Sequence, residues 1–290
     1  MTDLIDAAIG VIGGSGLYQF EGLEETEEHE ISTPFGDPSD RIIGGRFQGR
    51  PVYFLPRHGR GHRLLPTELN HRANIWALRS LGVRWVLSAT AVGSLKEAYR
   101  PQDLVVPDQF FDRTSSRAQH TFFGNGLVAH VAFGDPTSAT LRGLIAESAD
   151  AEGVPHHLGG VYVNMDGPAF STRAESEANR QLGFDVIGMT NLPEAKLARE
   201  AEMAFATLAF ITDYDCWKVD EDPVTAETVI GHLLANAETA KRLLRRIIPR
   251  IPDRAEDPEH WALDSALVTA KEHWPDDVKE RLHPILSRFL

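Results

Sequence analysis

Residues that could do chemistry gather in short polar segments, each placed directly after an apolar run. Gly13–Gly16 follows Ile9–Ile12, and Arg57–His62 follows Val52–Leu55. A glycine-rich turn lets backbone N–H groups converge on an anion, and arginine offers a planar fork of donors that matches phosphate oxygens. The two segments favour an oxyanion site, although either could be only a tight turn or a solvated loop.

Two further segments add hydroxyl groups. Ser88–Ser94 carries Thr90 at the expected end of a strand, and Gly188-Met189-Thr190 ends another apolar run. Hydroxyl groups and exposed backbone at strand ends can bind an anion, which would extend the same site. The alternatives are a plain turn for the first segment and a core position for Met189.

Two carboxylates stand shortly after the apolar run Ala204–Ile211, at Asp213 and Asp215. Buried carboxylates are costly to leave unsatisfied. They can accept hydrogen bonds from an amine or, when protonated, donate one to a ring nitrogen. Either side chain could instead cap a following segment.

An oxyanion site facing a carboxylate pair suits phosphorolysis of a nucleoside. Phosphate must be held under the anomeric carbon while the departing base receives a proton or hydrogen bond. A dinucleotide-binding oxidoreductase is a weaker hypothesis, because Gln19 stands where the fingerprint needs its third glycine. A hydrolase is opposed by Arg57 and His58. A zinc site at His58 and His62 lacks a carrying helix and a carboxylate at ligand spacing.

The composition bounds the class of protein. The 290 residues are 42% hydrophobic and 24% charged, as in ordinary globular proteins, and the net charge is −13. Such an acidic chain is a poor partner for nucleic acids or anionic membranes. Cys216 is the one cysteine, which excludes an intrachain disulfide and a cysteine-based metal cluster. With no secretory leader and no long apolar run, we expect a soluble, cytoplasmic protein.

The elements that must position these segments alternate between short apolar runs and amphipathic stretches, which is typical of an α/β fold. Predicted buried strands are Ile9–Ile12, Val52–Leu55, Val83–Ala89, Leu104–Val106, Gly160–Val163, Asp185–Met189 and Ala204–Ile211. Predicted helices are Ala73–Leu81, Leu141–Ala151, Ala195–Glu202 and a long one from an N-cap at Thr225 to Pro249. Because ligands bind at the carboxyl ends of strands in open α/β sheets, we expect one composite site.

The composition changes after Pro249, where a polar, proline-containing stretch leads into one or two short amphipathic helices. We therefore predict one domain over residues 1–249. Residues 250–290 are predicted to form a helical tail that packs on the same domain or on a neighbouring subunit.

The order of motifs from Ile9 to Pro249 resembles the S-methyl-5'-thioadenosine phosphorylases, a family of the trimeric purine nucleoside phosphorylase superfamily. The motifs are Gly13-Gly14-Ser15-Gly16, Thr33-Pro34-Phe35-Gly36, Arg57-His58-Gly59-Arg60, Asn74–Leu78, Thr90–Ser94, Gly167-Pro168 with Phe170-Ser171, Gly188-Met189-Thr190 and Asp213–Trp217.

The resemblance implies a three-layer α/β/α fold around a mixed, partly barrel-like sheet, assembled as a homotrimer. It implies conversion of S-methyl-5'-thioadenosine and phosphate into adenine and 5-methylthioribose 1-phosphate, in purine and methionine salvage. Inorganic phosphate would be a co-substrate, and neither a metal nor an organic cofactor is expected. The other partners expected are small-molecule substrates only.

Site residues follow from the same resemblance. The phosphate contacts it implies are Ser15, Arg57, His58, Thr90, Ala91 and Thr190. Met189 resembles the ribose contact and Phe170 the aromatic group against the base. Asp213 and Asp215 resemble the purine-recognition pair, with Asp213 near N7 as the catalytic group and Asp215 near the exocyclic amine. His130 resembles a residue lent across the trimer interface to the 5' side of a neighbouring site.

Ser171 and Asp213 bear on the choice of base. Relatives acting on 6-oxopurines carry Glu and Asn at these two positions, to bind N1–H and O6. Adenine presents an amine and no N1–H, so Ser171 with Asp213 favours 6-aminopurines, and a mismatched buried polar group costs about 1–3 kcal/mol. The alternative is a purine nucleoside phosphorylase acting on adenosine or 6-oxopurine nucleosides.

Overall fold

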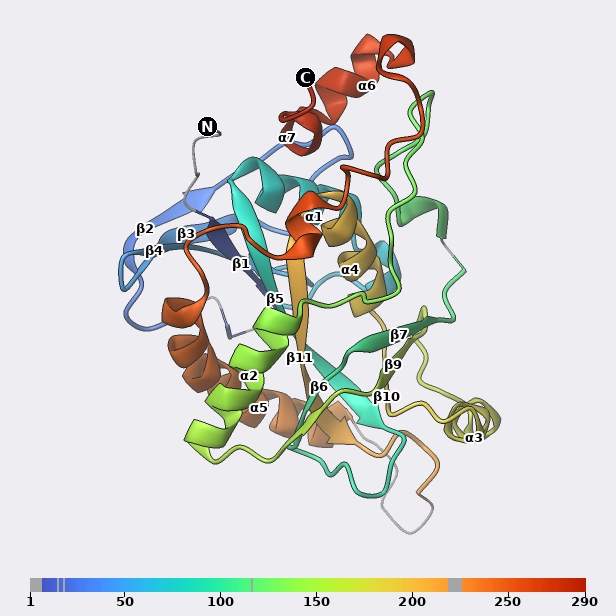
Figure 1. Ribbon diagram of the computed structural model, residues 1–290. Helices are drawn as coiled ribbons and strands as arrows, with labels where there is room; N and C mark the ends of the chain where they lie inside the picture. Colours follow the sequence, from blue (N-terminus) through green and yellow to red (C-terminus); the bar gives the residue numbers. More distant parts are fainter. Residues whose placement is uncertain (1–6, 15, 18, 116, 219–225) are drawn as a thin grey trace.

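A mixed β-sheet with helices on both faces forms the body of the molecule (Figure 1). The structure is a computed structural model, and it describes residues 7–14, 16–17, 19–115, 117–218 and 226–290. Over these residues the sheet has eleven strands. The α/β class and the mixed sheet expected from the sequence are confirmed.

The strands are β1 (Ala8–Gly13), β2 (Glu24–His29), β3 (Ile42–Phe47), β4 (Arg50–Pro56), β5 (Val83–Ser94), β6 (Leu104–Val106), β7 (Gln109–Asp112), β8 (His156–Leu158), β9 (Val161–Asn164), β10 (Val186–Gly188) and β11 (Ala204–Asp213). The helices are α1 (His71–Ser80), α2 (Ala139–Glu152), α3 (Arg173–Gln181), α4 (Asn191–Glu200), α5 (Ala226–Ile247), α6 (Asp276–Arg281) and α7 (His283–Leu286).

Strand β5 is the centre of the sheet. It pairs in parallel with β1 on one side and β11 on the other, and β1 pairs in parallel with β4. Its last residues, Gly93 and Ser94, pair antiparallel with β10, so the sheet turns there into a second, curled part made with β6, β9 and β11. The carboxyl ends of β1, β4, β5 and β11 therefore lie at one edge.

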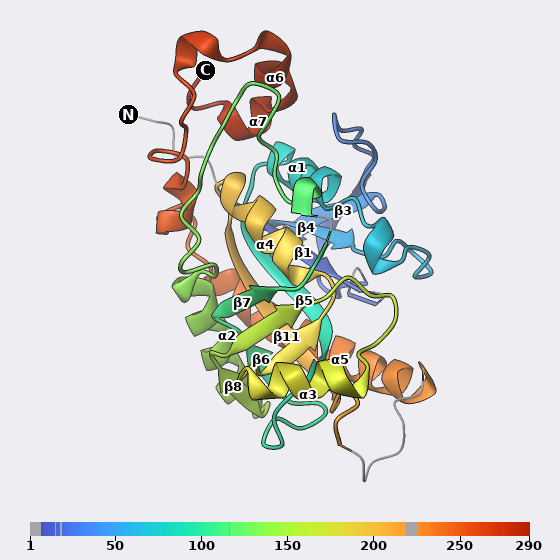
Figure 2. The ribbon, with the colours of Figure 1, turned by 90° about the vertical axis from the view of Figure 1, so that its right-hand side faces the viewer.

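Two apolar layers explain why β5 and β11 are buried along nearly their whole length. Trp85 and Leu87 pack with apolar residues of α2 and α5 on one face. Val86 and Phe205 pack with α1, α4 and the tail on the other. Figures 1 and 2 show these two helix layers on opposite sides of the central strands. Alternation of side chains along a strand assigns each residue to one layer.

The prediction that a loop begins at Ser88 is wrong, because β5 continues through Thr90 to Ser94. Small and β-branched residues keep the pleat, and β10 and β11 supply backbone partners on its two sides. Four further strands, β2, β3, β7 and β8, and helix α3 were not predicted. The residues of β2 are almost all exposed and polar, so its sequence carries no apolar alternation.

Helix α5 begins at Ala226 and ends at Ile247, close to the predicted long helix. The predicted N-cap, Thr225, lies outside the described residues.

Residues 263–290 lie against the outer side of α1 and α4 (Figure 1), whereas Ile251 packs in the layer of α2 and α5. Leu263, Val278 and Leu282 belong to the same apolar cluster as those helices. The Trp76 indole N–H donates to the Arg281 carbonyl, and Arg288 pairs with the fully buried Glu202. The tail therefore shares a core with the body of this chain; a division at residue 249 stays a prediction.

None of the helices in the described ranges is long and apolar enough to cross a membrane.

Candidate active site

The polar segments named from the sequence meet at the carboxyl edge of the central strands. The Arg57 backbone N–H donates to the Gly13 carbonyl at 2.9 Å, which holds the glycine-rich turn beside the arginine. The Arg57 Nη1 group donates to the Ala89 carbonyl of β5 at 3.0 Å. Hydrogen bonds thus join the residue after β4 to the end of β1 and to the middle of β5.

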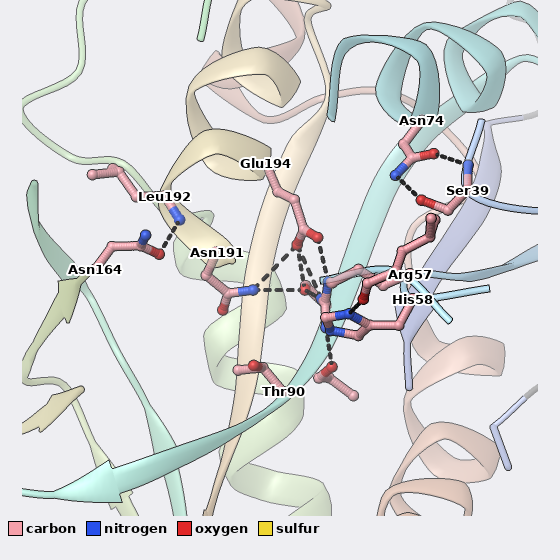
Figure 3. A network of polar contacts seen from close by, with 12 residues as sticks. Ser39, Arg57, His58, Asn74, Thr90, Asn164, Asn191, Leu192 and Glu194 are labelled. Carbon is pink, nitrogen blue, oxygen red and sulfur yellow. Dashed lines mark hydrogen bonds and ion pairs between the residues drawn. The ribbon is translucent and has the colours of Figure 1, made fainter. Parts of the chain in front are cut away.

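Arg57 is almost fully buried and is paired with Glu194 of α4, which is 1% exposed (Figure 3). Its Nε donates to Oε1 of Glu194, and its Nη2 donates to Oε2 at 3.1 Å and to the Ser88 hydroxyl. Ser88 donates in turn to Glu194, and the Asn191 amide donates to both. The arginine is held in a single orientation by three groups, the Glu194 carboxylate, the Ser88 hydroxyl and the Ala89 carbonyl.

This network sets the charge at the Arg57 end of the site, by which we mean Arg57, His58, Thr90, Thr190 and Glu194. Burial raises the pKa of Glu194, but the charge and hydrogen bonds of Arg57 outweigh it and hold that pKa below its usual value. Both partners of the ion pair are therefore ionised, and their opposite charges nearly cancel. Four of the five Arg57 N–H groups are used, which leaves one on Nη1 for a ligand.

His58 is a neutral imidazole. Burial, together with the charge of Arg57, lowers its pKa to about 4. Its Nδ1 lies 2.9 Å from the Leu64 carbonyl, which can only accept, so Nδ1 carries the hydrogen and Nε2 is an acceptor. The ring stacks on His62 with centroids 4.3 Å apart.

Thr190 stands at the N-terminus of α4, whose first backbone N–H groups have no partner within the helix; that of Leu192 donates instead to the Asn164 side chain at 3.1 Å. Its hydroxyl does not cap the helix, although it is the N-cap residue, and it is buried with no hydrogen-bond partner among the described residues. The partial positive charge of a helix N-terminus attracts anions. Thr90 and Ala91 lie within β5 and are half-buried. The Arg57 end would therefore bind an anion mainly through hydrogen-bond donors and a helix N-terminus, and only to a smaller extent through net positive charge.

The Asp213 end, Asp213 and Asp215, forms no ion pair with a cation among the described residues. Asp213 accepts from the Thr212 hydroxyl at 2.7 Å and from the Asp215 backbone N–H at 2.8 Å. Burial nevertheless raises its pKa, and the charge of Asp215 adds to the effect. A carboxyl group in this setting retains a proton to higher pH than an exposed one.

Asp215 has a left-handed backbone, with φ of 53°, which turns the chain sharply after β11. Burial raises its pKa, and the hydroxyls of Ser176 and Ser171 offset this only in part. Its Oδ2 is buried without a partner among the described residues. An oxygen in that state is an acceptor site for an N–H donor.

The two ends lie along the same strand. Arg57 contacts Ala89 of β5, and a Cβ on Gly93 would lie 3.1 Å from the Asp213 carboxyl group. Positions 89 and 93 are four residues apart, or about 13 Å at the rise of a β-strand. The two ends are therefore positioned by one strand, β5.

Phe170 and Met189 lie on the segments that follow β9 and β10. Phe170 is 65% exposed, so its ring is available to a ligand. A Cβ on Gly167 would collide with the Met189 sulfur at 2.4 Å, so the 165–172 segment lies directly on Met189. Ser171 is tied to the Asp213 end through Cys216, whose thiol lies 3.2 Å from the Ser171 carbonyl.

Two predicted site residues are not brought into this group. Ser15 lies outside the described residues. His130 is exposed on the segment beside the tail, where its backbone N–H donates to Ala266. In the described part of the chain, no hydrogen bond or ion pair joins its side chain to Arg57 or Asp213.

Sequence reasoning missed Glu194, Ser88 and Asn191, which hold Arg57. The predicted helix begins at Ala195, one residue after Glu194, whereas α4 begins at Asn191. A signal was present, because an arginine in a buried anion site needs a counter-ion and Glu194 is an acidic residue close to the predicted Thr190 contact. Over the described residues, no group of three or more acidic, His or Cys side chains could hold a metal ion.

Comparison with known proteins gives consistent results. The family model described as "Phosphorylase superfamily" matches residues 8–249. S-methyl-5'-thioadenosine phosphorylase of Chloroflexus aurantiacus is 54% identical over 283 residues, covering 98% of both chains. A methylthioadenosine phosphorylase from an antarctic soil metagenomic library superposes with a TM-score of 0.91 at 46% identity, covering 97% of this chain and 99% of that one. The Schistosoma mansoni enzyme in complex with adenine gives 0.81 at 31%, covering 97% and 98%.

Proposed function

The chain belongs to the phosphorylase superfamily, and we propose that its site catalyses phosphorolysis of S-methyl-5'-thioadenosine to adenine and 5-methylthioribose 1-phosphate. The reaction transfers a pentosyl group from a purine nitrogen to phosphate. Relatives of this name match the chain over nearly its full length at about half identity. The observation in this chain that carries the proposal is the single strand, β5, that links a neutral oxyanion site to an uncompensated carboxylate pair.

At the Arg57 end, phosphate would be bound by the free Arg57 N–H, the Thr90 and Thr190 hydroxyls, the Ala91 backbone and the N-terminus of α4. Because these donors are held before phosphate arrives, little reorganisation accompanies binding. The phosphate dianion then lies under the anomeric carbon, where it stabilises the positive charge that develops on the sugar. A phosphate oxygen then forms the new bond to the anomeric carbon. Met189 would contact the ribose.

At the Asp213 end, the base departs. The bond between the anomeric carbon and the purine nitrogen breaks with its electron pair going to the base. Asp213, which burial keeps protonated to higher pH, would donate to N7 and make adenine a better leaving group. The unpartnered Oδ2 of Asp215 would accept from the exocyclic amine, with Phe170 against the ring.

Neighbouring features extend the proposal. No cofactor is needed, since phosphate is the co-substrate. The exposed position of His130 supports a homotrimer in which it serves a neighbouring site, and light scattering of the purified protein tests that assembly. We place the reaction in the cytoplasm, which cell fractionation tests. We also assign it to methionine as well as purine salvage, which predicts that methylthioadenosine accumulates when the gene is deleted.

The experiment is phosphate-dependent base release from methylthioadenosine, adenosine and inosine. We expect methylthioadenosine to be preferred, inosine to be cleaved at least tenfold more slowly, and no product in phosphate-free buffer. A preference for adenosine or inosine would favour the alternative, a purine nucleoside phosphorylase. Undiminished cleavage without phosphate would indicate a hydrolase.

A further inference from the structure

Tyr162 of β9 carries a hydroxyl group that the site as described above does not use. The residue is fully buried, with its ring among Val92, Val186 and Ile211 in the curled part of the sheet. Its hydroxyl makes no hydrogen bond that satisfies normal geometry within the described residues. A buried hydroxyl without a partner costs free energy, so its retention calls for a function.

The backbone of β10 is shaped around this hydroxyl. A Cβ on Gly188 would lie 1.8 Å from the Tyr162 hydroxyl oxygen and 2.5 Å from the ring carbon that bears it. Any other residue at position 188 would displace the phenol. Gly188 is followed directly by Met189 and Thr190, so the hydroxyl lies where β10 enters the Arg57 end.

The groups around the hydroxyl are those of the Arg57 end. The Thr90 hydroxyl and the Thr190 backbone lie close enough to influence its ionisation, as do the charges of Arg57 and Glu194. Burial has the largest effect and raises the pKa of Tyr162 well above its usual value, so the hydroxyl keeps its proton. It is a permanent donor beside a second unpartnered hydroxyl, that of Thr190.

Two buried donors without acceptors in one place indicate an acceptor-rich ligand. We propose that the Tyr162 hydroxyl is a further phosphate-binding group, donating to the oxyanion at the buried end of the site. The inference rests on the proposed function for the identity of the ligand, inorganic phosphate. Gly188 then has a role of its own, because it leaves the space through which the phenol reaches the anion.

The test is Tyr162→Phe, which removes only the hydroxyl. A hydrogen bond to a charged partner is lost, so we expect the KM for phosphate to rise about tenfold or more. The KM for methylthioadenosine at saturating phosphate should change less than twofold. Without phosphate, the variant should melt at the same temperature as the parent or higher, because an unsatisfied buried hydroxyl has gone. A structural role would instead lower the melting temperature and leave the phosphate KM unchanged.

Tyr53→Phe is the matched control. Tyr53 lies in β4, packs on His29 and has no hydrogen bond to the site among the described residues, so its phosphate KM should equal that of the parent. An unchanged phosphate KM in Tyr162→Phe would overturn the proposal.

Melting with added inorganic phosphate separates this inference from the proposed function. If phosphate stabilises the parent and stabilises Tyr162→Phe much less, the assignment of Tyr162 as a phosphate-binding group is supported even when methylthioadenosine is not cleaved. Equal stabilisation of the two proteins would overturn the inference even when the parent cleaves methylthioadenosine as proposed.

Discussion

The Arg57 end, where Arg57 and Glu194 are buried, and the Asp213 end, where both carboxyl groups are half-buried, handle charge in opposite ways. At the Arg57 end a buried cation is matched by Glu194, and Ser88 and Asn191 satisfy the pair (Figure 3). At the Asp213 end two carboxyl groups lie together with hydroxyl and backbone donors, and neither is ion-paired with a cation in the part of the chain that the structure describes. Burial consequently raises the pKa values of Asp213 and Asp215, whereas the pKa of Glu194 stays low.

This contrast explains how one site can perform two tasks. A paired charge cannot readily exchange a proton, so the Arg57 end is suited to holding an ion in a fixed position. An unpaired buried carboxyl group exchanges its proton near its raised pKa, so the Asp213 end is suited to assisting a leaving group. Three predictions test this contrast.

The largest effect is expected from Asp213→Asn. The amide has nearly the same shape but cannot transfer a proton to N7, and loss of a general acid lowers turnover about 100-fold to 10,000-fold. The phosphate KM should change little, because phosphate binds at the other end. Steady-state kinetics with methylthioadenosine measure both quantities.

Asp257→Asn is the control for Asp213→Asn. Asp257 accepts from the Ser138 and Thr140 hydroxyls at the start of α2, away from β5, and turnover should stay near that of the parent. Parent-like turnover in Asp213→Asn would rule out the leaving-group role.

The second prediction concerns Arg57→Ala. Sequence reasoning expects this change chiefly to weaken phosphate binding, but the structure adds a larger consequence. Glu194 would remain buried without its partner, and breaking a buried ion pair costs about 3–5 kcal/mol of unfolding free energy. Urea unfolding measures it.

Two variants sharpen that measurement. Replacing both partners, as in Arg57→Met with Glu194→Leu, should restore much of the stability while phosphate binding stays weak. Arg41→Ala removes the exposed ion pairs with Glu28 and Glu30 and should cost no more than about 1 kcal/mol. A small cost in Arg57→Ala, similar to that of Arg41→Ala, would show that the two ends do not differ as described.

The smallest effect is on the pH dependence of stability, where the ends have opposite signs. The pKa of His58 is 6.5 when unfolded and about 4 when folded, so its contribution is present above pH 6.5 and lost as the pH falls toward 4. Asp213 has a raised folded pKa, so its contribution is present at low pH and lost as the pH rises through that value.

Melting temperatures across pH measure these contributions. His58→Asn should lose part of the slope between pH 4 and 6.5, and Asp213→Asn should be stabilised relative to the parent at neutral pH. Identical profiles for the two variants would contradict the assignment of opposite signs.

Several elements could be read from the sequence because the signal is local. Apolar runs predicted β1, β4, β6 and β11, and a long apolar stripe predicted α5. The end of β5 could not be read, because Thr90–Ser94 looks like a turn until β10 and β11 supply its partners. β2 is exposed and polar, so only its pairing with β3 makes it a strand.

The sequence by itself determined which residue types are available, the α/β class and, through its motifs, the family. Folding decides that Glu194 neutralises Arg57, that Gly188 makes room for the Tyr162 hydroxyl and that the Asp215 Oδ2 has no partner among the described residues. The physical reason is that charge state and hydrogen bonding depend on burial and on partners up to 137 residues away in the chain. The periodicity and short motifs of a sequence do not specify how deeply a side chain is buried or which distant residue it contacts.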